Sequence, residues 1–81
     1  MRLPRDLSGE DLAGALSAFG YVVTRQTGSH MRLTTQEHGE HHITIPRHAS
    51  LRVGTIAAIL ADVGDHFGLS REAVVERLFA R

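Results

Sequence analysis

The sequence predicts an α+β domain in which one helix, three antiparallel strands and two further helices follow one another along the chain. Apolar residues at helical spacing occupy both ends of the 81-residue chain, and alternating runs rich in β-branched residues occupy its middle. A three-stranded antiparallel sheet of this order has one face covered by the helices. Its other face remains for a partner or a ligand.

The first helix is expected between Ser8 and Gly20. Ser8 is a favourable N-cap, and Asp11 three residues later resembles the second half of a capping box. Gly20 supplies a left-handed stop. The apolar face of this helix consists of Leu12, Ala15, Leu16 and Phe19.

Three strands are expected over residues 21–25, 30–35 and 41–45, with a turn over residues 26–29. Pro46 either ends the third strand or marks a sheet edge, because proline cannot donate a ladder hydrogen bond. The strands therefore form two consecutive hairpins.

The register of the second hairpin has two solutions. Apolar residues share one face in each strand, namely Met31 and Leu33 in the second and Ile43 and Ile45 in the third. Because a one-residue slip inverts a strand, burying all four requires an odd number of loop residues. A three-residue loop over 38–40 pairs Leu33 with Ile45 and sets His30 opposite His48, whereas a five-residue loop over 36–40 makes the two histidines diagonal neighbours. In either register, the polar face gathers His30, Arg32 and His48, with His42 and Thr44 as further candidates.

Two helices are expected after a loop over residues 47–54. The first begins at Thr55 and stops at Gly64. Ser70 caps a short final helix. The apolar positions are Ile56, Ile59, Leu60 and Val63 in the first of these helices and Val74, Val75, Leu78 and Phe79 in the second.

Composition indicates one soluble, cytoplasmic domain over residues 1–81. The chain has no cysteine, which removes disulfides and thiolate metal sites and suits a reducing compartment. It has no apolar run of membrane-spanning length, and residues 1–5 lack the apolar core of a signal peptide. The formal net charge is zero, but residues 21–53 hold four arginines against two glutamates. Positive charge therefore concentrates around the predicted sheet.

The segment Gly28-Ser29-His30 carries the strongest candidate chemistry. Glycine permits a turn or the close approach of a ligand, and a histidine with a reference pKa of about 6.5 can exchange a proton near neutral pH. On RNA, such a histidine can deprotonate a 2′-hydroxyl or protonate a leaving 5′-oxygen. The charge on the phosphate could be stabilised by Arg25, Arg32 or Arg47. This chemistry needs no metal and no cofactor.

Two other kinds of site fit the sequence less well. His38, His41 and His42 cluster at a turn, but adjacent His41 and His42 point to opposite faces of a strand, so a solvated hairpin tip is favoured over a metal site. Ser29 is adjacent to His30 and poorly placed to use it as a base, and the chain has no strand-to-helix nucleophile elbow.

Three segments occur in an order similar to that of the HicA-type mRNA interferase toxins. They are Gly28-Ser29-His30, Ile43-Thr44-Ile45-Pro46-Arg47-His48, and Gly54-Thr55-Ile56-Ala57-Ala58-Ile59-Leu60 followed by Gly64. The resemblance covers about residues 8–64. It implies a double-stranded-RNA-binding-like α-β-β-β-α fold with a short extra C-terminal helix.

The resemblance also implies an endoribonuclease toxin that cleaves mRNA. His30 is then the catalytic residue, Gly28 and Ser29 form its turn, and His48 is a supporting candidate. The implied partners are the mRNA substrate and a HicB-type antitoxin that covers the active face. Many relatives are basic, with lysine before the second helix, whereas this chain is neutral and places only Arg52 there.

Two non-catalytic functions remain compatible with the residues alone. A fold of this order can bind double-stranded RNA through its shape, phosphates and 2′-hydroxyls. Alternatively, the open sheet face or a sheet edge can accept another protein chain.

Overall fold

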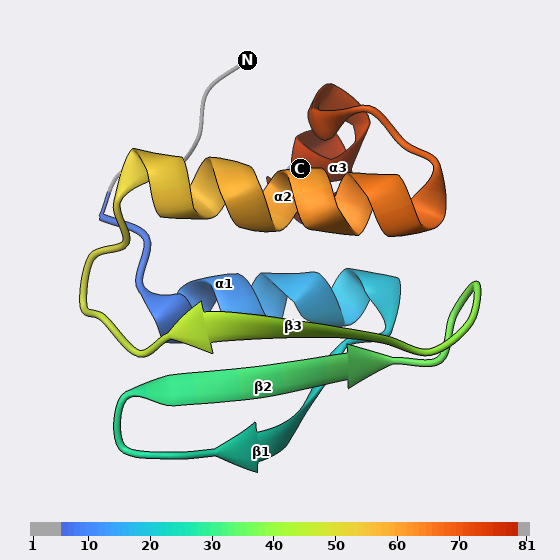
Figure 1. Cartoon of the computed structure of the whole chain (residues 1–81). Helices are drawn as coiled ribbons and strands as arrows, with labels where there is room; N and C mark the ends of the chain where they lie inside the picture. The colour runs from blue at the N-terminus through green and yellow to red at the C-terminus, as the bar shows by residue number, and fades with distance from the viewer. Residues whose placement is uncertain (1–5, 80–81) are drawn as a thin grey trace.

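The computed structural model describes residues 6–79, and its elements follow the expected order (Figure 1). Residues 1–5, on which the signal-peptide prediction rests, lie outside this range. Within it, no helix is both long and apolar enough to cross a membrane. The elements are α1 (Gly9–Ala15), the 3₁₀ helix η1 (Leu16–Phe19), β1 (Val22–Gln26), β2 (His30–Thr35), β3 (His41–Pro46), α2 (Val53–Phe67) and α3 (Arg71–Phe79).

The predicted start and end of the first helix are confirmed. The backbone N–H of Asp11 donates to Ser8 Oγ at 2.9 Å, and that of Ser8 donates to Asp11 Oδ2 at 3.2 Å, which completes the capping box. The last turn tightens into η1 and ends at Gly20, whose φ of 82° is left-handed.

The sheet has the order β1-β2-β3, and its second hairpin adopts the five-residue loop. Thr35 pairs with His41 and His30 pairs with Pro46, so the three-residue alternative is excluded. Beyond the strands, the N–H of Arg47 donates to the carbonyl of Ser29 at 2.9 Å. Hydrogen-bonded and non-hydrogen-bonded pairs alternate, so His30 and Pro46 form a non-hydrogen-bonded pair. Pro46 therefore costs the ladder no hydrogen bond.

The first hairpin turns through only two residues, Gly28 and Ser29, because the N–H of Thr27 donates to the carbonyl of His30 at 2.9 Å. The pairing of β1 with β2 is irregular between Val23 and Arg25, where β1 contains a bulge. All five residues of β1 are exposed, as expected for an edge strand with little covering it.

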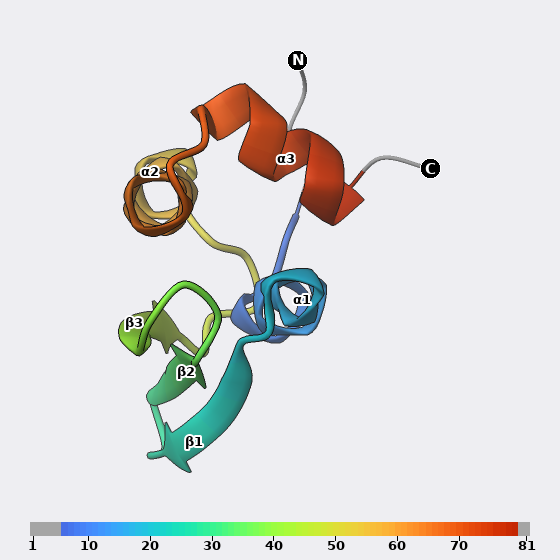
Figure 2. The ribbon, with the colours of Figure 1, turned by 90° about the vertical axis from the view of Figure 1, so that its right-hand side faces the viewer.

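The helices cover one face of the sheet, as expected, and leave the other face open (Figure 2). α3 packs against α2 and η1 rather than against the sheet. The apolar residues buried between these layers are Leu7, Leu12, Leu16, Phe19, Tyr21, Met31, Leu33, Ile43, Ile45, Leu51, Ile56, Ile59, Leu60, Val63, Val74 and Val75.

The predicted end of the second helix at Gly64 is wrong. α2 continues to Phe67, and the left-handed residue that ends it is Gly68, with a φ of 68°. Gly64 is buried within the helix, and a Cβ at this position would lie 2.7 Å from the carbonyl oxygen of Leu69. Glycine is needed here because the chain folds back closely over the helix. The predicted cap of α3 is confirmed, since Ser70 Oγ accepts from the N–H of Ala73 at 3.1 Å.

Candidate active site at the first hairpin

His30 is exposed and occupies the first position of β2, immediately after the two-residue turn. Its backbone is fixed by Thr27. The N–H of His30 donates to Thr27 Oγ1 at 3.1 Å, while its carbonyl accepts from the N–H and the hydroxyl of Thr27 at 2.9 and 3.3 Å. The imidazole therefore extends from a rigid end of the hairpin into solvent.

The ring of His30 is oriented by its neighbour. Ser29 Oγ lies 2.9 Å from His30 Nδ1. A hydroxyl can donate to an unprotonated ring nitrogen or accept from a protonated one, so this contact persists in either charge state. Within residues 6–79, no hydrogen bond involves His30 Nε2. Nε2 is thus the nitrogen that can exchange a proton with a ligand.

Gly28 precedes this pair at the tip of the hairpin. Its φ is not left-handed, and a Cβ built on it would meet no atom within 4 Å. Neither the turn nor the packing of this chain therefore requires glycine at this position. Glycine at this position would let the backbone of the turn approach a ligand closely.

Two arginines lie near His30, Arg32 on the same strand and Arg25 on the neighbouring strand β1. Arg32 is two residues further along β2, on the same face, and it pairs with Arg25 of β1 and Thr44 of β3. Neither guanidinium forms an ion pair within residues 6–79. Both charges are free to meet an anion near the imidazole.

The other candidate residues lie in the loop after β3. The guanidinium of Arg47 is 3.2 Å from Glu10 Oε2, so its charge is partly satisfied. His48 lies beyond Pro46 and does not stand opposite His30, although the backbone N–H of its neighbour Arg47 donates a hydrogen bond to the carbonyl of Ser29. Arg52 is exposed immediately before α2 and forms no ion pair in the described part of the chain.

His42 and Thr44 lie on the open face, as the alternation predicts. His42 is held there by Thr34 Oγ1 at 2.7 Å from Nδ1 and by Glu40 Oε2 at 2.8 Å from Nε2. Thr34 Oγ1 is also 2.9 Å from Thr24 Oγ1. The nitrogens of His42 are thus both occupied, unlike those of His30.

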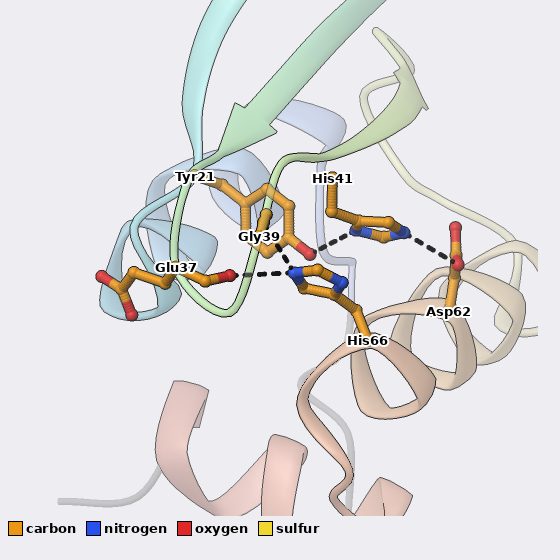
Figure 3. Close-up of polar contacts among 6 residues, drawn as sticks. All are labelled: Tyr21, Glu37, Gly39, His41, Asp62 and His66. Atoms are coloured by element: carbon orange, nitrogen blue, oxygen red, sulfur yellow. Dashed lines mark hydrogen bonds and ion pairs between the residues drawn. The ribbon is translucent and has the colours of Figure 1, made fainter.

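Sequence reasoning missed a second histidine site at the opposite end of the sheet (Figure 3). We call it the two-histidine cluster; its members are Tyr21, Glu37, Gly39, His41, Asp62 and His66. The Tyr21 hydroxyl lies 2.7 Å from His41 Nδ1, and Asp62 Oδ1 lies 3.2 Å from His41 Nε2. The ring of His41 also stacks on that of His66, with centroids 4.4 Å apart and planes 10° apart.

The expectation of a solvated hairpin tip is therefore wrong for His41, whose side chain is only 20% exposed. Tyr21 is buried, which together with the negative charge of Asp62 raises its pKa to about 12. Tyr21 thus stays a hydrogen-bond donor to Nδ1, so the proton of neutral His41 is on Nε2, facing Asp62. The sequence does show that Asp62 and His66 lie four residues apart, a spacing that puts two side chains on one face of a helix.

His66 holds the loop between β2 and β3. Its Nε2 lies 2.9 Å from the carbonyl oxygen of Glu37 and 3.0 Å from that of Gly39. Since both partners are acceptors, Nε2 carries the proton and donates to the loop. In the part of the chain that the structure describes, no group of three or more potential ligands could hold a metal ion.

One comparison with known proteins identifies the family. The sequence model described as the HicA toxin of bacterial toxin-antitoxin matches residues 9–64, from the start of α1 into α2. No curated protein and no solved structure gives a significant match. The matched segment spans more than half of the chain and includes the whole sheet with the hairpin of His30. The chain therefore belongs to the HicA toxin family, the toxins of bacterial toxin–antitoxin systems.

Proposed function

We propose that this toxin is a metal-independent endoribonuclease that cleaves mRNA by acid–base catalysis at His30, and so inhibits translation and growth. The observation that carries the proposal is the geometry of the imidazole. His30 is exposed, its Nδ1 is engaged by Ser29 at 2.9 Å, and Arg32 lies on the same face of β2. An oriented ring with one free nitrogen beside unpaired positive charge suits proton transfer at a phosphodiester.

The reaction needs two proton transfers. When the 2′-oxygen attacks the adjacent phosphorus, the 2′-hydroxyl loses its proton and the bond from phosphorus to the 5′-oxygen breaks. The 5′-oxygen leaves with a proton, so the products are a 2′,3′-cyclic phosphate and a 5′-hydroxyl. Neutral Nε2 of His30 can take the first proton, and protonated Nε2 can give the second. Arg25 and Arg32 stabilise the charge that accumulates on the phosphoryl oxygens.

Family membership implies an antitoxin partner. We propose that this partner is a HicB-type protein in the cytoplasm and that it covers the open sheet face. The polar side chains of that face include His30, Arg32 and Thr44, all of which are exposed. An antitoxin seated there would keep RNA away from the hairpin.

Replacing His30 tests the catalytic assignment. His30→Ala removes Nε2, the atom to which both proton transfers are assigned, so the cleavage rate should fall by about 10²- to 10⁴-fold. The measurement is the cleavage rate of a defined RNA, with growth after induction scored in parallel. Circular dichroism should show an unchanged fold, because His30 is exposed. A wild-type rate in the variant would contradict the mechanism.

His42→Ala is the matched control, because His42 lies on the same face but has both nitrogens occupied. It should cleave at close to the wild-type rate. A chelator should leave cleavage unchanged, since no step uses a metal ion. Inhibition by the chelator that added metal reverses would argue against the proposed chemistry.

A non-catalytic function is the alternative, supported by the exposed edge strand β1. Val22 and Val23 are 59% and 46% exposed along an edge whose backbone groups can pair with another chain. A protein-interaction or RNA-binding module would bind its partner without cutting RNA. Binding by both wild type and His30→Ala, with intact RNA in each case, would favour this alternative.

A further inference from the structure

The apolar pattern specifies the register of β2 and β3 only weakly. A shift of two residues leaves every side chain on its original face. The observed register makes two apolar pairs, Met31 with Ile45 and Leu33 with Ile43. The shifted register, which a three-residue loop would close, keeps one such pair by joining Leu33 to Ile45. The apolar residues thus favour the observed register by a single pair, and contacts elsewhere in the molecule can add to this preference.

The contacts of the two-histidine cluster form in the observed register and would be lost in the shifted one. Its first half fixes β3, since His41 contacts Tyr21 before β1 and Asp62 on α2. Sliding β3 by two residues along β2 would move His41 by about 7 Å, well beyond hydrogen-bond distance of both partners. The stack of His41 on His66 would be lost as well.

The second half of the cluster fixes the five-residue loop itself. A single N–H, that of His66 Nε2, is within 3.0 Å of two loop carbonyls, those of Glu37 and Gly39 (Figure 3). The loop needs left-handed backbone at His38 and Gly39, with φ of 57° and 97°. Positive φ is uncommon for a residue with a side chain, even though histidine is one of the types enriched there, so the contacts of His66 add to the loop's own hydrogen bond from the N–H of Gly39 to the carbonyl of Gln36.

We propose that His41 and His66 are positioning residues that set the register of β2 against β3 and thereby the surroundings of His30. The inference rests on the proposed function only for its consequence at His30. In the observed register, His30 faces Pro46, which carries no charge and no donor. In the shifted register, His30 would face His48, and Arg32 rather than His30 would face Pro46. Residues at one end of the sheet thus determine which side chain stands opposite the imidazole at the other end.

Disulfide trapping measures the register directly, because the chain contains no cysteine of its own. Arg32 and Thr44 form a non-hydrogen-bonded pair on the open face, where the Cα atoms are close enough for a disulfide. The double variant Arg32→Cys, Thr44→Cys therefore reports the observed register. The double variant Thr34→Cys, Thr44→Cys reports the shifted one. In a glutathione redox buffer, the ratio of their effective concentrations gives the populations of the two registers.

Both reporter pairs are then placed in chains that carry His66→Leu or His66→Gln. Leucine fills a similar volume but has no donor, and we expect the ratio to move toward the shifted register by about tenfold, the effect of roughly one hydrogen bond. Glutamine keeps an N–H donor and should restore most of the ratio. A ratio unchanged within twofold in His66→Leu, together with a lower melting temperature, would show a merely stabilising role and overturn the proposal.

Two further arms complete the experiment. If His66→Leu does not fold, the ratio is read in His41→Gln, for which an unchanged value also overturns the proposal. RNA cleavage by the His66 variants, without reporter cysteines, should fall in parallel with the population of the observed register. Cleavage that stays at the wild-type rate while the register shifts would overturn the proposed effect of the register on His30. Absence of cleavage by the wild-type chain would contradict the proposed function and leave the disulfide ratio interpretable.

Discussion

Ser29 and His30 are adjacent in sequence, yet their side chains are hydrogen-bonded at 2.9 Å. The contact orients the ring rather than activating the hydroxyl, because Ser29 meets Nδ1 and the proposed proton transfer takes place at Nε2. Ser29→Ala should therefore lower kcat by up to about tenfold, the effect of one hydrogen bond, with little change in KM. Steady-state kinetics on a defined RNA checks this. Ser29→Thr keeps the hydroxyl and should recover most of the rate; a loss equal to that of Ser29→Ala would contradict an orienting role.

Ionisation of Tyr21 is expected to lower the stability of the folded protein at alkaline pH. Burial and the charge of Asp62 raise its pKa to about 12, above the ordinary value of 10. Below pH 10 the phenol is protonated in both the folded and the unfolded chain. Between pH 10 and 12 only the unfolded chain loses the proton, so the free energy of unfolding falls by roughly 2 to 3 kcal/mol as pH rises through this range.

Denaturant unfolding at successive pH values measures this loss. The chain has one tyrosine, no lysine and no cysteine, so Tyr21 is the side chain that titrates between pH 10 and 12. Tyr21→Phe should be less stable near neutral pH, because it loses the hydrogen bond to His41, but its stability should be nearly flat over this range. An equal fall in both proteins would rule out Tyr21 as the cause.

Single residues were predictable where their partners are local. Asp11 with Ser8, and His30 at the end of a turn, could be identified because each depends on neighbours within three residues. The surroundings of His41 could not, since they come from segments 20 and 21 residues away. Alternation in β3 places His41 on the same face as Ile43 and Ile45, but the presence of Asp62 and His66 above it depends on the path of α2.

At the level of elements, the start of α1 is packed closely against the end of β3. A Cβ on Gly9 would clash with the carbonyl oxygen of Pro46, and the N–H of Gly9 donates to the carbonyl of His48 at 3.0 Å. Gly9→Ala must push these elements apart, so it should lower the free energy of unfolding by about 1 to 3 kcal/mol. Thermal or denaturant unfolding measures the change.

Gly14 provides the control in the same helix. It is exposed, and a Cβ there would meet no atom within 4 Å. Gly14→Ala should therefore stabilise the protein by about 0.5 to 1 kcal/mol through the higher helix propensity of alanine. If the two variants had similar effects, the close approach of α1 to β3 would not be the cause of the loss at Gly9.

Element types were predictable from periodicity, but one boundary and one register were not. Gly64 and Gly68 are both plausible helix stops, and the choice between them depends on the carbonyl of Leu69, which approaches Gly64 only in the folded chain. Similarly, alternation allowed two registers for β2 and β3. Both questions concern contacts between elements, on which a local pattern carries no information.

For the whole molecule, the distribution of charge matters more than the net charge of zero. Arg25, Arg32 and Arg52 form no ion pair in residues 6–79, whereas Arg47 is paired with Glu10. A neutral protein can thus present a local positive surface to the RNA substrate that we propose. Because few charges contribute, this surface should give weak, moderately salt-dependent binding.

The salt dependence of RNA binding measures how many arginines of this positive surface contact RNA. If the three candidate-site arginines that form no ion pair within residues 6–79, Arg25, Arg32 and Arg52, each neutralise one phosphate, the plot of log K against log salt concentration should have a slope of about −2 for single-stranded RNA, since each neutralised phosphate contributes about −0.7. Glu10→Gln removes the partner of Arg47, 3.2 Å away, and makes a fourth guanidinium of the candidate site free. The slope should then steepen to about −3. Fluorescence titrations with 2′-O-methyl RNA, which cannot be cleaved through its 2′-oxygen, provide the measurement. An identical slope in both proteins would show that Arg47 does not contact RNA, which would confine the binding surface to the strand arginines and Arg52.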